Sequence, residues 1–278
     1  MRLQQIATET VAALERGNYT NSGGISVDIA AMLKHCVTST QCYNPDSLAG
    51  IRDQVLAQPA TLDHTIFEIV NETTLQGCTR LVGSGAYQRI GALNFASAKH
   101  PGGGFLGGAK AQEESLARSS GLYKSLLQCN AYYGFHRTQK TCLYSDRMIY
   151  SPACPVLRTD RGDWLDQPYL IDFITSPAPN AGAILRNEPG NSVHIPRVLK
   201  ERSSKLLALA AYHGCDVLIL GAWGCGAFRN DPEMVAPIFA EQLKPGGPYW
   251  GRFRKVLFSV YDTSATQNIY RAFAHQFA

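Results

Sequence analysis

The stretch PGGGFLGGAKAQEE, residues 101–114, carries the strongest signal in this sequence. It places five glycines in a short segment and two adjacent carboxylates, Glu113 and Glu114, directly after them. Glycine lets backbone N–H groups approach a ligand closely and reaches positive φ without penalty. A loop of this kind that leads into a helix is the usual anion-binding arrangement, because free N–H groups and the helix dipole act at one point. We therefore expect acid/base chemistry on a phosphate-bearing substrate.

A second glycine loop, GAWGCGAFRNDP at residues 221–232, follows the continuous apolar run 216–220. Asp231 and Pro232 are typical of a helix start, with aspartate at the N-cap and proline at N1. Taken alone, the loop is as consistent with a packing turn as with an anion site. It matches neither the P-loop nor the dinucleotide-binding fingerprint. Two such loops in one α/β chain together indicate a clamp around a diphosphate.

The two carboxylates are expected to perform different tasks. Adjacent residues on a helix diverge by ~100°, so Glu113 and Glu114 point in different directions. One could protonate a leaving group while the other fixes a substrate hydroxyl; the alternative is a plain first-turn acid pair that interacts with the helix dipole. Asn94, at a predicted strand end, is suited to bind a sugar hydroxyl, with an ordinary turn as the alternative. For Lys99 and His100 we favour solvated loop residues.

Strand and helix patterns alternate from about residue 61 onward. Strands are predicted at residues 66–70, 90–95, 147–150, 169–174, 216–220 and 254–261, and helices at 75–81, 109–127, 195–212, after 231 and from about 265. Interleaving of this kind predicts α/β layers around a mainly parallel or mixed sheet. Residues 1–60 instead predict helices at 3–14, at 29–37 and around 48–55, the last capped by Asp46 or Ser47. We therefore divide the chain into a helical extension, residues 1–60, and an α/β domain, residues 61–278.

Composition narrows the functional class. The chain has 278 residues, 45% of them hydrophobic and 17% charged, and a net charge of +4, which is far from the dense basic stripe of a nucleic-acid binder. No apolar run approaches the ~18 residues of a membrane span, and the first residues lack a signal-peptide core. The eight cysteines form no CxxC pair and have no zinc-finger spacing. We expect reduced thiols in a cytoplasmic protein that holds no metal.

Two of these motifs resemble a known family. PGGG at residues 101–104, followed by QEE at 112–114, looks like the signature of the compact microbial (bacterial-type) poly(ADP-ribose) glycohydrolases. The resemblance extends to residues 70–75, 94–101 and 224–232, and covers roughly residues 60 to 265. It implies a macrodomain, a three-layer α/β/α fold with a mixed sheet and an N-terminal helical extension, which holds ADP-ribose between two loops. It implies no cofactor.

The resemblance also implies a role for individual residues. Glu114 would protonate the departing ribose oxygen and then activate water, Glu113 would hold a hydroxyl of the neighbouring ribose, and Asn94 would hold the terminal ribose. Substrate contacts are further expected from Gly102, Gly103, Gly104, Gln112, Gly224, Cys225, Gly226, Ala227 and Phe228. Tyr261 would stack on adenine and Glu72 would accept from its amino group, although a core tyrosine and an exposed turn glutamate fit these two positions equally well.

The resulting functional hypothesis is a glycohydrolase that releases ADP-ribose, mainly from the ends of poly(ADP-ribose). Two alternatives use the same pocket: a hydrolase that removes single ADP-ribose units from protein or nucleic acid, and a non-catalytic ADP-ribose reader. A generic nucleotide-binding module leaves the QEE placement unexplained. We expect ADP-ribosylated proteins as substrates, no direct nucleic-acid binding, no membrane contact and a monomer, with the first sixty residues acting as a structural cap rather than as a partner surface.

Overall fold

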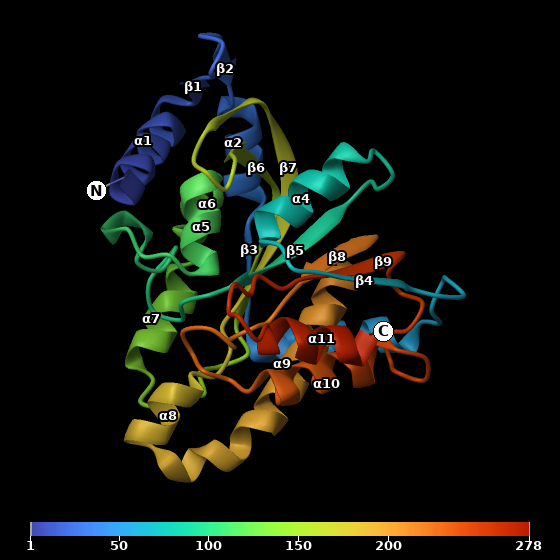
Figure 1. Cartoon of the computed structure of the whole chain (residues 1–278). Helices are drawn as coiled ribbons and strands as arrows, with labels where there is room; N and C mark the ends of the chain where they lie inside the picture. The colour runs from blue at the N-terminus through green and yellow to red at the C-terminus, as the bar shows by residue number, and fades with distance from the viewer. Residues whose placement is uncertain (1, 278) are drawn as a thin grey trace.

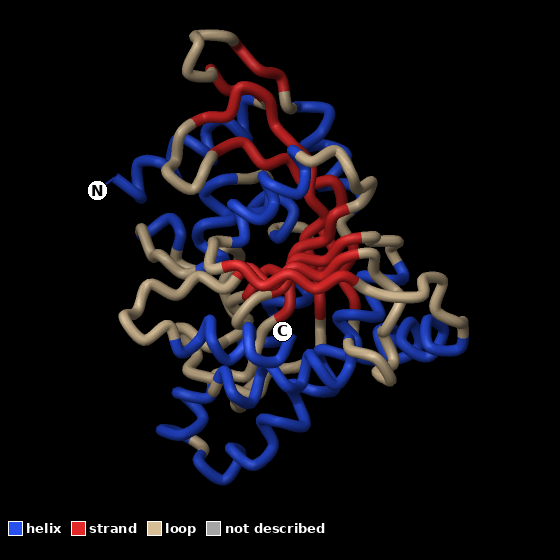
Figure 2. Tube along the Cα trace, turned by 45° about the vertical axis from the view of Figure 1, so that its right-hand side comes forward, coloured by secondary structure: helices blue, strands red, loops and turns tan. Residues whose placement is uncertain are grey.

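A seven-stranded sheet crosses the centre of the computed structural model, which describes residues 2–277 (Figures 1 and 2). In spatial order the strands are β3 (Gln41–Tyr43), β6 (Met148–Arg158), β7 (Trp164–Ser176), β5 (Ile90–Phe95), β8 (Val217–Leu220), β9 (Lys255–Ser259) and β4 (Ile66–Val70). The strands from β7 to β4 run parallel, whereas β3 and β6 pair antiparallel. The predicted mixed sheet is confirmed.

Helices cover both faces of the sheet (Figure 2). Both faces of β8 are apolar and have to be covered. Its side chains alternate between the two faces, so that Leu218 and Leu220 belong to one buried cluster and Val217 and Ile219 to the other. The first face is covered by α3 (Pro45–Ala57), α8 (Ala181–Asn187), α9 (Ile195–Tyr212), α10 (Pro232–Leu243) and α11 (Asn268–Phe277), and the second by α4 (Thr74–Gly83), α5 (Gln112–Ser119), α6 (Leu122–Leu126) and α7 (Asn130–Thr138). The three-layer α/β/α prediction is confirmed. Within residues 2–277, no helix is both long and apolar enough to cross a membrane.

The N-terminal segment contains more than the predicted helices. Besides α1 (Arg2–Arg16), α2 (Ala30–Ser39) and α3, it holds the small β1–β2 hairpin (Asn18–Thr20, Ser26–Asp28) and the edge strand β3. The cap of α3 is also different: the Asn44 side chain accepts a hydrogen bond from the Ser47 N–H at 2.8 Å, so the expected caps Asp46 and Ser47 were wrong. Because β3 pairs with β6, this segment completes the sheet, and the domain boundary at residue 60 stays a prediction.

The single helix predicted for residues 109–127 is wrong, because the chain forms two helices there. Ser120 is extended and pairs with Val156 in an isolated bridge. The Gly121 N–H donates to the Pro155 carbonyl at 2.8 Å, and a Cβ at Gly121 would lie 2.9 Å from Leu33 Cδ1. The close passage over β6 therefore interrupts the helix, and only α5, which starts at Gln112, carries the two glutamates.

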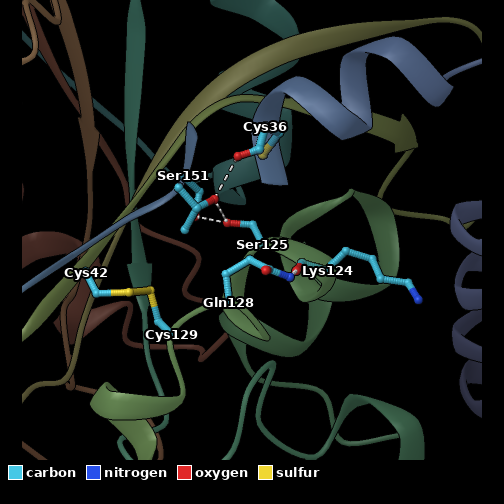
Figure 3. The surroundings of a disulfide bond; sticks show 8 residues. Cys36, Cys42, Lys124, Ser125, Gln128, Cys129 and Ser151 are labelled. Atoms are coloured by element: carbon cyan, nitrogen blue, oxygen red, sulfur yellow. Dashed lines mark hydrogen bonds between the residues drawn. A yellow bond between two sulfur atoms is a disulfide. The ribbon is translucent and has the colours of Figure 1, made fainter. Parts of the chain in front are cut away.

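The expectation that all eight cysteines are reduced is wrong for two of them. Cys42 on β3 and Cys129 just before α7 form a disulfide (Figure 3). The two residues are 87 positions apart, and only the placement of the edge strand brings them together, so no spacing motif could reveal the pair. The other six cysteines are free, and five of them are buried as expected of small core residues.

Replacing Cys42 and Cys129 together by serine should lower the free energy of unfolding by about 2–4 kcal/mol, because the bond closes a long loop and restricts the unfolded chain. Urea unfolding of the two proteins measures this difference. Dithiothreitol should destabilise the wild type by a similar amount and leave the double variant unchanged. Equal sensitivity of both proteins to the reductant would show that the bond does not form in solution.

Candidate active site

A cleft of about 790 Å³ opens where the parallel strands β4, β5, β8 and β9 end. Both glycine loops line it, as the sequence predicted. Of the predicted site residues, those in its wall are Gly103, Gly104, Gln112, Glu113, Glu114, Gly224, Gly226, Ala227, Phe228 and Tyr261. The tertiary structure thus brings residues from four separate parts of the chain to one place.

Four predicted residues lie outside the cleft wall. Asn94, Gly102 and Cys225 are buried behind it. Glu72 is turned to Arg80, whose guanidinium donates to Glu72 Oε1 at 2.7 Å. Any contact of these residues with a ligand therefore has to pass through their neighbours or follow a rearrangement.

Glu113 points into the protein and is only 2% exposed. Its Oε2 accepts from the Ser97 N–H at 2.6 Å and its Oε1 from Asn94 Nδ2 at 3.2 Å. Burial raises the pKa of Glu113 to about 8, against the lowering effect of these hydrogen bonds, and the neighbouring Glu114 carboxylate adds to the rise. Asn94 thus contacts the carboxyl group of Glu113 and holds it in place.

Glu114 lies beside the first glycine loop instead. Its Oε1 accepts from the Gly104 N–H at 3.0 Å. Its Oε2 is buried and has no hydrogen-bond partner within residues 2–277. The predicted divergence of Glu113 and Glu114 is what the structure shows, because the two carboxyl groups bind different backbone N–H groups, those of Ser97 and Gly104.

Glycine is required at position 103 for a steric reason. Its φ is +59°, and a Cβ there would lie 2.2 Å from Glu114 Oε1. The backbone therefore approaches the Glu114 carboxylate more closely than any side chain would permit. Gly107, in the short 3₁₀ turn Phe105–Gly107 of the same loop, has open space at its Cβ position.

The second glycine loop is shaped by Asn230. Its buried amide donates to the carbonyls of Gly224, at 3.1 Å, and Pro179, at 2.8 Å. Gly224 has φ +76°, and a Cβ there would lie 2.4 Å from that amide. The loop then enters α10, where Asp231 accepts from the Glu233 N–H, so the predicted helix start is confirmed.

Gln112 connects α5 to the sheet. Its Oε1 accepts from the Phe95 N–H at 2.9 Å, and its Nε2 donates to the Leu93 carbonyl at 2.7 Å and to Thr74 Oγ1 at 3.0 Å. The side-chain amide thus imitates a neighbouring strand at the end of β5. Both the oxygen and the nitrogen of the Gln112 side-chain amide are therefore bonded to the protein, and these hydrogen bonds hold the start of α5 against β5.

Helix α1 packs against the same machinery. Gln4 Nε2 donates to the Gly107 carbonyl at 3.1 Å, and Thr10 Oγ1 donates to the Arg118 carbonyl at 2.7 Å, while Ala7 packs on Phe105. The N-terminal segment therefore contacts both the first glycine loop and the helix that carries the two glutamates.

The structure adds cleft residues that sequence reasoning did not select. Thr73, Ser115 and Asp160 line the wall, and so do His100 and Lys110. The sequence contains a signal for Thr73, because a threonine followed three residues later by Gln76 is the pattern of the capping box that the two residues form at the start of α4. Asp160 had none, because it lies in residues 151–168, for which no element was predicted, and the extension of β6 and β7 into that stretch brings it to the cleft.

Gly103→Ala should reduce turnover by at least about tenfold, because the new methyl group displaces the Glu114 carboxylate from its hydrogen bond with Gly104. Gly107→Ala is the matched control in the same loop and should keep wild-type activity. Steady-state assays of both variants, with thermal melting to monitor folding, measure the effect. Equal activity of the two variants would show that the close approach at position 103 does not matter.

The raised pKa of Glu113 predicts a pH-dependent stability. Because the folded state holds this proton up to about pH 8, its stabilising effect is complete below the ordinary pKa of 4.5 and is lost as the pH rises through 8. Relative to Glu113→Gln, the wild type should therefore lose up to about 1.4 kcal/mol per pH unit between pH 5 and 8. Urea unfolding of both proteins across that range measures the difference, and parallel curves would contradict it.

Comparisons with known proteins agree with this geometry. A family model described as the catalytic domain of microbial-type PARG matches residues 7–159. The crystal structure of poly(ADP-ribose) glycohydrolase from Thermomonospora curvata is 48% identical, with 99% of each chain covered and a TM-score of 0.95. Its complex with the inhibitor ADP-HPD is also 48% identical over 99% of each chain, with a TM-score of 0.91.

A second relative comes from Deinococcus radiodurans. Its poly(ADP-ribose) glycohydrolase in complex with ADP-ribose is 41% identical and covers 88% of this chain and 96% of its own, with a TM-score of 0.83. No curated protein matches the chain. With the family model matching over half of its length and near-complete coverage at 48% identity, the chain belongs to the microbial-type poly(ADP-ribose) glycohydrolase family.

Proposed function

We propose that this protein hydrolyses the ribose–ribose O-glycosidic bond of poly(ADP-ribose), mainly at chain ends, and releases ADP-ribose. The observation that carries the proposal is the placement of Glu114 in the wall of a cleft between two glycine loops, with one oxygen bound by the Gly104 N–H and the other without a hydrogen-bond partner among residues 2–277. The relatives in complex with ADP-ribose and ADP-HPD support the class of ligand.

The mechanism follows from the chemistry of this bond. Glycosidic cleavage passes through an oxocarbenium-like state and needs a proton on the leaving oxygen. Glu114 Oε2 would donate that proton and then take one from the water that attacks the sugar. Glu113, fixed by Ser97 and Asn94, would hold a hydroxyl of the neighbouring ribose. The substrate's own diphosphate, close to the developing positive charge, would stabilise it.

The remaining contacts follow the walls of the cleft. The diphosphate and terminal ribose would lie between residues 102–104 and 224–226, with Phe228 packed over the sugar-phosphate. Tyr261 follows β9 and is 64% exposed at the cleft wall, so its ring is free to stack on adenine. Asn94 would act on the terminal ribose through Glu113, since it lies behind that carboxyl group.

The proposal extends to partners and location. We take poly(ADP-ribose) and ADP-ribosylated proteins as the substrates of a monomer that needs no cofactor. Six free cysteines support a reducing, cytoplasmic location, whereas the Cys42–Cys129 disulfide is more usual in oxidising compartments.

Glu114→Gln should lower kcat on poly(ADP-ribose) by about 10²–10⁴-fold, because the amide cannot supply the proton. Binding of ADP-ribose should change little, since the amide keeps the shape of the side chain. Release of free ADP-ribose and isothermal titration measure the two effects. Glu233→Gln, an exposed glutamate in the first turn of α10, is the matched control and should behave as wild type.

The outcomes separate the candidate functions. Near-wild-type turnover by Glu114→Gln would reject Glu114 as the acid. Tight ADP-ribose binding by the wild type without release from polymer would favour a reader, or a hydrolase acting on single ADP-ribose units, over the proposed activity.

A further inference from the structure

The helix that carries Glu114 also carries a buried cation that has no role in the chemistry above. Arg118 follows Glu114 by one turn on α5 and is 7% exposed. Among residues 2–277 its guanidinium forms no ion pair within 4 Å. A buried guanidinium therefore has to be stabilised by hydrogen bonds or by an opposite charge nearby.

The guanidinium of Arg118 holds the end of the first glycine loop. Its Nη1 donates to the Ala109 carbonyl. The Ala109 N–H donates to the Gly104 carbonyl at 3.2 Å, and the Gly104 N–H donates to Glu114 Oε1 at 3.0 Å. Because Glu114 and Arg118 are neighbours on the surface of one helix, these contacts form a ring that begins and ends on α5.

The loop is anchored differently at its two ends. Near its start, the side chain of Phe105 is 1% exposed and packs with Ala7 and Ala117. At its end, residues 109–111 are exposed and lie in neither a helix nor a strand. The side chain of Arg118 therefore connects an exposed segment, which has no apolar anchor of that kind, to the buried side of α5.

The charge of Arg118 acts on the same carboxylate. Burial lowers the pKa of the guanidinium, and the negative charge of Glu114 opposes that effect. The two groups attract each other without direct contact, while the Glu114 oxygen stays on the Gly104 N–H. Arg118 lies outside the cleft wall, so it acts on a ligand through Ala109 and Gly104 rather than by touching it.

We propose that Arg118 is a positioning residue, which holds the first glycine loop on α5 and so keeps the Glu114 carboxylate on the Gly104 N–H in the orientation that turnover needs. The proposal rests on the proposed function, because it takes Glu114 as the acid. Arg118 then affects the rate of the chemical step and not the binding of ADP-ribose.

The test compares kcat and KM on poly(ADP-ribose), and the dissociation constant of ADP-ribose, among variants of Arg118. Arg118→Met loses the charge and the donor, and it should lower kcat about tenfold with both other constants within about twofold of the wild type. Arg118→Gln, which is polar but too short to reach the Ala109 carbonyl, should show the same loss. Arg118→Lys keeps the charge and one donor and should restore kcat to within about threefold of the wild type.

Arg252→Met is the matched control. Arg252 also donates to loop carbonyls, those of Pro248 and Gln58, but it precedes the start of β9, whereas the cleft lies where β9 ends. This variant should behave as the wild type. Thermal melting monitors the folding of all four variants.

Amide hydrogen exchange gives a second readout, which does not require turnover. The loop segment around Gly104 should exchange about tenfold faster in Arg118→Met than in the wild type, because the ring of hydrogen bonds is opened. In Arg252→Met the same segment should exchange at the wild-type rate.

Each outcome decides the proposal. An unchanged kcat in Arg118→Met and Arg118→Gln, or unchanged exchange of the loop, would overturn it. Weaker ADP-ribose binding with an unchanged kcat would indicate that Arg118 contacts the ligand, and a loss that Arg118→Lys does not relieve would indicate a packing role; both would overturn it too. A wild type that releases no ADP-ribose from polymer would refute the proposed function, and the exchange rates would still decide whether Arg118 holds the loop.

Discussion

The attachment of α5 to the end of β5 by the Gln112 amide is the constraint on which the site depends. The amide pairs with the Leu93 carbonyl and the Phe95 N–H as a neighbouring strand would, and it fixes where the helix begins. The next two residues then diverge by the helical rotation, Glu113 into the core and Glu114 toward the glycine loop. Without that anchor, nothing would fix which of the two carboxylates faces the core and which faces the glycine loop.

The consequence is electrostatic as well as geometric. Burial favours the neutral form of Glu113, whose pKa rises to about 8, and this lowers the negative charge at the wall of the cleft. The cost of burying the carboxyl group is offset by hydrogen bonds from Ser97 and Asn94. Gly103 completes the arrangement, because only a residue without a Cβ lets the loop reach the Glu114 carboxylate.

Many features of the fold and of the site could be predicted from local sequence patterns. The glycine loops, the Asp231 cap, the long helix α9 and most strand positions were predicted because each depends on a few neighbouring residues. The wrong predictions share a different cause, because each depends on contact with residues far away in the sequence. The break at Gly121 results from contact with Pro155 of a distant strand, the edge strand β3 from pairing with β6, and the Cys42–Cys129 bond from that same edge position.

The sequence by itself therefore determined the α/β layering, the two glycine loops and the position of the two glutamates directly after the first of them, since all of these follow from short-range spacing and residue type. Only the tertiary structure decided which groups face the cleft. It placed Asn94 behind Glu113, paired Glu72 with Arg80, and brought Asp160 to Thr73 across 87 residues. Such contacts depend on strand order and on helices packed across the sheet, and no local pattern encodes the distance between segments so far apart in the chain.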